Sequence, residues 1–198
     1  MEKEIDEVRL TPDEYIKDHW VPNKIYKHCY EAKHTLRYQT CVDNIVGHNV
    51  LDYGCATGHS IDIMDNLSKG KHRWFGTDIS EVALRTAKEF FPKYTYLKMI
   101  SDYQVNTNGL YFDTVICTEV NEHVASPGDL VIEVYRLAKK RAVFTTPINI
   151  IKDPTHMVVF RRLGLEVIFD AAGFPYEIFR IAHDQNSKHY VVVVNLER

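Results

Sequence analysis

The 198-residue sequence has few features of a membrane, disulfide-stabilised or nucleic-acid-binding protein. No apolar run approaches the roughly 20 residues that cross a bilayer, and the opening MEKEIDEVRL is too charged for a signal peptide. The four cysteines show no CxxC spacing, so we interpret them as reduced and mostly buried. The formal charge of −3 gives no electrostatic reason to expect nucleic acid. These absences predict a cytoplasmic protein with neither a membrane nor a nucleic-acid partner.

Length and composition predict one domain. A chain of 198 residues supports one full hydrophobic core and not two, and 45% hydrophobic with 26% charged residues is ordinary for a globular protein. No repeat, linker or low-complexity segment interrupts it. We expect a helical cover over residues 1–46 and a core over residues 49–198, both within the one domain 1–198.

Lysine and arginine are also missing between Val42 and Asn66, where the most informative stretch of the chain lies. An apolar run from Asn49 to Tyr53 predicts a buried strand, and a helical pattern begins at His59. The small-residue loop between them lacks the lysine of a phosphate-binding P-loop. It also keeps only the first of the three glycines that mark a dinucleotide site. A phosphate ligand is therefore not expected here.

Carboxylates gather around this loop instead. They lie at or just after the predicted strand ends, at Asp52, Asp78, Asp102, Glu119 and Glu122. A carboxylate about 6 Å from a cation contributes roughly 3 kcal/mol at an effective dielectric near 20 and would repel a pyrophosphate by a similar amount. The site therefore suits a cofactor with positive charge and a ribose. S-adenosylmethionine, with its sulfonium and ammonium groups, meets this description.

The rest of the chain alternates between strand and helix patterns, which predicts an α/β fold with a doubly wound, seven-stranded, mostly parallel sheet. After the strand 49–53 we expect strands at 73–77, 94–100, 112–118 and 142–146, then an antiparallel hairpin of 176–182 and 189–196. Helices are expected at 11–20, 23–46, from 59 to about 67, 81–90, 126–138 and 159–172. The short basic clusters at 139–141 and 161–162 are interpreted as solvated helix ends.

Five segments in this order resemble the class I S-adenosylmethionine-dependent methyltransferases, close to the broad small-molecule and O-methyltransferase group. They are VLDYGCATG (50–58), FGTDIS (75–80), FDTVICTEVNEHV (112–124), TTP with DPTH (145–156) and AAGF (171–174). The resemblance implies the Rossmann-like methyltransferase fold. It also implies S-adenosylmethionine as cofactor, S-adenosylhomocysteine as product, and a small-molecule acceptor.

The resemblance also assigns cofactor-binding residues. Asp78 lies 20 residues after Gly58, where it would accept from both ribose hydroxyls, and Ser80 is a better placed cap for the following helix. Ile79 would pack on the adenine, and Asp102 would hold the adenine amino group unless it only forms a turn. The remaining expected contacts come from Asp52, Gly54, Cys55, Ala56, Thr57, Gly58, Thr118 and Glu119.

Glu119, Glu122 and His123 are spaced i, i+3 and i+4, and His156 follows the fifth predicted strand. If the first three are helical they share a side, so all four could meet above the cofactor. Three interpretations stay open. His123 or His156 is a general base, the four residues hold a divalent metal, or the cluster is structural.

We therefore expect methyl transfer to a small molecule, at oxygen, by in-line displacement with histidine-assisted deprotonation. The partly similar small-RNA methyltransferases suggest metal-assisted 2′-O-methylation of RNA ends as an alternative. An NAD-dependent oxidoreductase and a non-catalytic cofactor-binding module are the alternatives from other classes. The aromatic side chains before residue 46 either cover the sheet or form a substrate lid.

Overall fold

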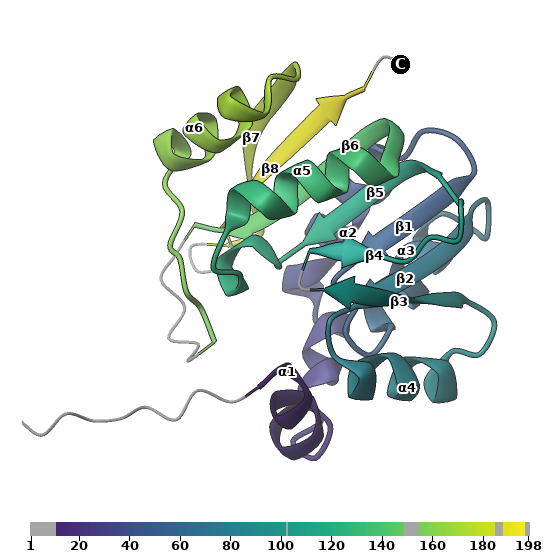
Figure 1. Ribbon diagram of the computed structural model, residues 1–198. Coiled ribbons are helices and arrows are strands. Elements are labelled where there is room, and N and C mark those ends of the chain that lie inside the picture. The colour runs from purple at the N-terminus through teal and green to yellow at the C-terminus, as the bar shows by residue number, and fades with distance from the viewer. Residues whose placement is uncertain (1–10, 102, 149–154, 185–187, 197–198) are drawn as a thin grey trace, which may run out of the picture.

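A computed structural model describes residues 11–101, 103–148, 155–184 and 188–196. Figure 1 shows one mixed sheet with helices on both faces, so the expected α/β, Rossmann-like fold is confirmed. The strands are β1 (Asn49–Tyr53), β2 (Arg73–Asp78), β3 (Thr95–Ser101), β4 (Gln104–Val105), β5 (Phe112–Thr118), β6 (Ala138–Pro147), β7 (Tyr176–Ala182) and β8 (Lys188–Asn195). Among the described residues, no helix is both long and apolar enough to cross a membrane.

The strand order is β4-β3-β2-β1-β5-β6-β8-β7. The strands β3, β2, β1, β5 and β6 are parallel, and β8 and β7 form the expected antiparallel hairpin at one edge. The order reverses between β1 and β5, and ligands of such sheets bind at the carboxyl ends of the strands beside this reversal. The small-residue loop 54–58, which we call the glycine loop, follows β1 and therefore lies at that position.

The sheet has eight strands among the described residues, one more than predicted. The extra strand, β4, has two residues and pairs antiparallel with the end of β3. A strand of two residues is too short to show a hydrophobic pattern in the sequence. The Glu133 carboxylate stabilises β4 by accepting a hydrogen bond from Val105 N at 2.9 Å. We predicted a helix end at the basic cluster 139–141. This prediction was wrong, because β6 begins at Ala138 and includes the cluster.

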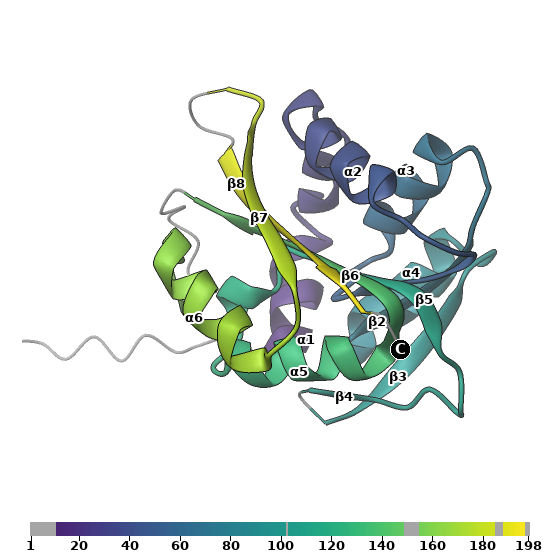
Figure 2. The same cartoon turned by 90° about the horizontal axis from the view of Figure 1, so that it is seen from above.

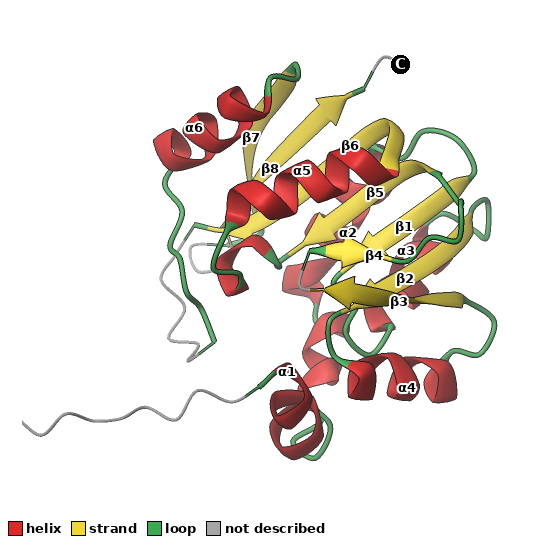
Figure 3. Cartoon of the chain, viewed as in Figure 1, coloured by secondary structure: helices red, strands yellow, loops and turns green. Residues whose placement is uncertain are grey.

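The helices divide between the two faces, as Figures 2 and 3 show. One core joins the sheet to α5 and α6, and a second joins it to α2, α3 and α4. Their bounds are α1 (Pro12–Glu14), α2 (Ala32–Asp43), α3 (His59–Leu67), α4 (Glu81–Phe90), α5 (Pro127–Leu137) and α6 (Arg162–Ala172). In the first core Phe169 packs edge-on against Phe144, with ring centroids 5.0 Å apart.

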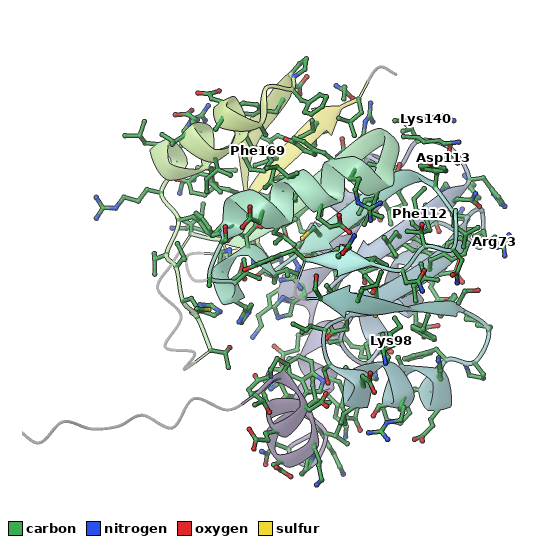
Figure 4. The ribbon with its side chains drawn as sticks, viewed as in Figure 1. Arg73, Lys98, Phe112, Asp113, Lys140 and Phe169 are labelled. Carbon is green, nitrogen blue, oxygen red and sulfur yellow. The ribbon has the colours of Figure 1, made fainter. Side chains whose placement is uncertain are left out.

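The amino ends of the strands lie on the side of the sheet away from the glycine loop. There Asp113 accepts from His48 N and Asn49 N, and it also pairs with Lys140 Nζ at 2.8 Å (Figure 4). These bonds fix the start of β1 against the start of β5. They hold in register the two strands whose opposite ends carry the candidate site.

The N-terminal helices differ from the prediction. The helix expected at 11–20 is a short α1, with the predicted Thr11 capping box, continued by the π-helix η1 (Tyr15–Trp20). The single helix expected at 23–46 is divided into the 3₁₀ helix η2 (Ile25–Tyr30) and α2. Glu31 separates them because its backbone is extended, at φ −70° and ψ 142°. The sequence carries no glycine or proline at this break.

Candidate functional site

The glycine loop leaves β1 in a sharp turn. Gly54 has φ +80°, and its amide and that of Cys55 donate to Thr77 O at 2.8 and 2.9 Å. A Cβ at Gly54 would lie 2.4 Å from Val120 Cγ2. Glycine is therefore required here for the turn and for the approach of Val120.

Asp78 fastens the loop to the end of β2. Its carboxylate accepts from Ala56 N at 2.8 Å through Oδ2 and from Ser80 N at 2.9 Å through Oδ1. Burial raises the pKa of Asp78, and these amides oppose that change. Ser80 Oγ accepts from Ala83 N, which confirms Ser80 as the cap of α4. The next side chain after Asp78, Ile79, is 45% exposed beside the loop.

Asp52 is fully buried at the centre of the sheet. Its Oδ2 accepts a short hydrogen bond from Ser60 Oγ, whereas its Oδ1 has no hydrogen-bond partner. Burial raises the pKa of Asp52 to about 7; the hydrogen bond from Ser60 opposes this rise, and the charge of Asp78 adds to it. An unpartnered buried oxygen of this kind is costly unless a donor completes it. Asp52 is therefore suited to a ligand that brings a donor or a positive charge.

A cavity of about 130 Å³ opens beside the loop. It brings together most of the predicted cofactor residues with side chains from the N-terminal segment. Its wall consists of Trp20, Cys29, Arg37, Tyr38, Gly54, Cys55, Ala56, Thr57, His59, Ser60, Thr118 and Glu119. Asp52, Gly58, Asp78 and Ile79 are not in this wall, and Asp102 lies outside the described residues.

Glu119 forms a buried ion network at the end of β5. Its Oε2 contacts Arg37 Nη1 at 3.1 Å and His189 Nε2 at 3.3 Å, and its Oε1 accepts from Thr145 Oγ1 at 3.1 Å. Although burial favours the neutral acid, Arg37 and then His189 lower the pKa of Glu119 to about 2. Glu119 is therefore a permanent anion at neutral pH.

Arg37 and His189 were not among the predicted site residues. Arg37 is 7% exposed, and its Nε has no hydrogen-bond partner. It lies on the buried face of α2 with Tyr38 and Cys41, so an arginine on an otherwise apolar helix face was the available signal. His189 precedes the apolar run of β8, and only the pairing of β8 with β6 brings it to the site.

The expected cluster of four acidic and imidazole groups is only partly formed. Glu122, His123 and His156 each place one potential metal-ligating atom within 4.8 Å of the others. Glu119 does not join them because its backbone has φ +56° and directs the carboxylate to Arg37. Only Asn121–His123 is helical, as the 3₁₀ helix η3, so the i, i+3, i+4 argument was wrong for Glu119.

The three remaining groups are closely coupled. The rings of His123 and His156 meet edge to face, with centroids 4.7 Å apart. His123 Nδ1 bonds to Thr155 Oγ1 at 2.9 Å, and its Nε2 lies 4.0 Å from Glu122 Oε1. Burial and then the Glu119 charge raise the pKa of Glu122 well above its ordinary value. The cluster thus pairs a carboxyl group whose burial favours the protonated form with two imidazoles, an arrangement that can hold a proton or a cation.

Comparison with known proteins identifies a methyltransferase domain within the chain. A family model described as "Methyltransferase domain" matches residues 51–146. The chain is 32% identical over 137 residues to a ubiquinone biosynthesis O-methyltransferase of Thiobacillus denitrificans; the match covers 66% of this chain and 57% of the relative. It is 29% identical to the same-named protein of Nitrosospira multiformis, over 83% of this chain and 73% of the relative. With 57% coverage, the chain spans little more than half the length of the former.

The fold is shared with solved methyltransferases. Magnesium protoporphyrin IX methyltransferase from Synechocystis PCC 6803, in a structure with bound S-adenosylmethionine, superposes with a TM-score of 0.69. The sequences are 16% identical, and the match covers 96% of this chain and 99% of that one. Residues 51–146 therefore match the methyltransferase domain family, and the chain shares the fold of solved S-adenosylmethionine-dependent methyltransferases.

Proposed function

We propose that this chain binds S-adenosylmethionine and transfers its methyl group to a small-molecule acceptor, at oxygen. The observation that carries the proposal is the glycine loop with buried carboxylates and no lysine or arginine of its own. Such a site stabilises a positively charged ligand by roughly 3 kcal/mol per carboxylate at about 6 Å and opposes a phosphate by as much. The curated relatives named above, O-methyltransferases of ubiquinone biosynthesis, support oxygen as the acceptor atom.

The residues present fit this cofactor. A carboxylate offers about four acceptor positions, and the backbone amides use two of those on Asp78, which leaves capacity for two ribose hydroxyls. Asp52 Oδ1 and Glu119 provide negative charge for the cationic end of the ligand. Arg37, which lines the cavity and whose Nε has no hydrogen-bond partner among the described residues, provides a cation suited to a carboxylate. Ile79 offers an exposed apolar surface for the adenine.

The protein contributes position and proton transfer to the reaction. When bound, S-adenosylmethionine supplies an electrophilic methyl group for in-line displacement. Holding the acceptor oxygen in line with it accounts for roughly 7–11 kcal/mol of the barrier. His156 or His123 takes the acceptor proton, and Thr155 orients the His123 ring. A general base of this kind contributes about 10²–10⁴-fold in rate.

A metal-assisted reaction is the second candidate for the same acceptor. Glu122, His123 and His156 could hold a divalent cation that orients and acidifies the hydroxyl, whereas the Glu119 carboxylate is directed to Arg37. Chelation followed by readdition of Mg²⁺ or Zn²⁺ separates the two mechanisms. An activity that survives chelation favours the base, and one restored only by the metal favours the cation.

Calorimetry tests the cofactor first. S-adenosylhomocysteine should bind with a stoichiometry of one and NADH should not, and the opposite result would replace the methyltransferase with an oxidoreductase. With a turned-over acceptor in hand, His156→Ala should slow methyl transfer by about 10²-fold or more while the affinity for S-adenosylhomocysteine stays unchanged. An unchanged rate would remove His156 as the base. Absence of turnover on any acceptor would favour a binding module.

A further inference from the structure

Residues 11–30, which we name the N-terminal strap, lie across the glycine loop and the start of α4. Figure 1 shows α1 beside α4, far from it in sequence. Asp13 Oδ1 accepts from Ser80 Oγ at 2.6 Å and from Val82 N at 3.2 Å. Trp20 Nε1 donates to Thr57 Oγ1 at 3.2 Å. The strap is therefore attached at Ser80, two residues after the proposed ribose-binding Asp78, and at Thr57 in the glycine loop.

Few apolar side chains hold the strap in place. Among the strap residues whose side chains the structure describes, only Ile16 is buried. Tyr26 stacks on His59 with centroids 4.6 Å apart, and Tyr30 meets the same ring edge-on at 5.8 Å. A segment with little buried apolar surface opens at a low free energy, well below that of global unfolding. The polar bonds of Asp13 therefore make up a large share of what keeps the strap closed.

The closed strap narrows the cavity beside the glycine loop. Trp20 and Cys29 form part of the wall of a cavity of about 130 Å³, whereas pockets for small molecules are about 300–1,000 Å³. Beyond the strap, α2 is fixed by the buried Arg37–Glu119 pair. The extended backbone at Glu31 lies between the two, which is where a hinge would allow the strap to move without moving α2.

We propose that the strap is a gate for cofactor exchange, with Glu31 as its hinge and Asp13 as its latch. The gate opens to admit S-adenosylmethionine and to release the product, and Asp13 closes it by bonding the start of α4. Asp13 is a positioning residue, since it acts through Ser80 and Val82 and not on the reacting atoms. This inference rests on the proposed function for the identity of the ligand.

Stopped-flow measurement of the association and dissociation rates of S-adenosylhomocysteine tests the proposed role of Asp13. Hydrogen bonds to a charged group contribute about 1.5–3 kcal/mol, so Asp13→Ala should raise the association and dissociation rates by tenfold or more, with a smaller change in their ratio. Asp13→Asn keeps an acceptor for Ser80 and Val82 and should restore most of the slow exchange. Asp18→Ala, which removes an exposed carboxylate from the same strap, is the matched control and should exchange at the wild-type rates.

A second measurement needs no cofactor. Cys29 lies on the cavity side of the strap, and burial raises the pKa of its thiol, while the other three cysteines are buried in the core. Alkylation of Cys29, followed by mass spectrometry, should be tenfold faster in Asp13→Ala. Wild-type exchange and alkylation rates in Asp13→Ala, with only a lower melting temperature, would overturn the latch. If the wild-type protein did not bind S-adenosylhomocysteine, the proposed function would fail, and alkylation would still decide whether Asp13 holds the strap.

Discussion

The Arg37–Glu119 pair should be among the most sensitive polar contacts in the protein. The Nη1 to Oε2 distance is 3.1 Å, and the two side chains are only 8% and 20% exposed. At a charge separation near 4 Å and an effective dielectric of 20, the attraction is about 4 kcal/mol. The low pKa of Glu119, about 2 against an ordinary 4.5, corresponds to about 3 kcal/mol. Arg37→Met keeps the aliphatic packing and should therefore cost about 3–5 kcal/mol of unfolding free energy.

Urea unfolding followed by tryptophan fluorescence and circular dichroism measures this loss. The matched control is Arg162→Met, which breaks a shorter contact, 2.7 Å to Glu166, between side chains that are 53% and 31% exposed. Solvent screens that pair, so its loss should cost no more than about 0.5 kcal/mol. Equal losses in the two variants would refute the reasoning that burial and not distance decides the effect.

Two further measurements strengthen the test. The double variant Arg37→Met/Glu119→Gln should recover most of the lost stability, because it leaves no unpaired buried charge. The folded pKa of Glu119 lies below its unfolded value, so its contribution is present above about pH 4.5 and is lost as pH falls through about 2. The difference in stability between wild type and Arg37→Met should therefore shrink over that pH range.

Two other predictions concern the glycine loop. The folded pKa of Asp52 is about 7 against an ordinary 3.8, so its contribution to the free energy of unfolding is present below pH 4 and is lost as pH rises through 7. Asp52→Asn should remove this pH-dependent loss of stability, by up to about 4 kcal/mol at pH 8 in chemical denaturation. The same variant should bind S-adenosylhomocysteine more weakly. Unchanged pH dependence would contradict the buried charge. Gly54→Ala should cost about 2–5 kcal/mol, from a Cβ 2.4 Å from Val120 Cγ2 and from the positive φ, and adding Val120→Ala should restore the steric part alone in a double-mutant cycle. A full rescue would mean that the backbone is not strained.

Local patterns along the chain were sufficient to predict several elements of this protein. The strand Phe112–Thr118 and the helix Glu81–Phe90 have the predicted bounds, because hydrophobic period and capping residues are read within a few positions. The glycine loop and its lack of basic residues were equally visible, and they carried the choice of cofactor. Where no local signal exists, as at Glu31 and in β4, the prediction was wrong.

Which charged groups meet depends on how distant parts of the chain pack together. Glu119 directly follows β5, Arg37 lies in α2 and His189 lies in β8. The left-handed backbone of Glu119 turns its carboxylate away from Glu122 and His156. Asp13 reaches Ser80 across 67 positions of the chain. Such partners are chosen by the packing of helices on the sheet, and no periodicity along the sequence records them. Residue types can therefore predict the chemistry of the site, whereas the pairing that sets each group's charge depends on the fold.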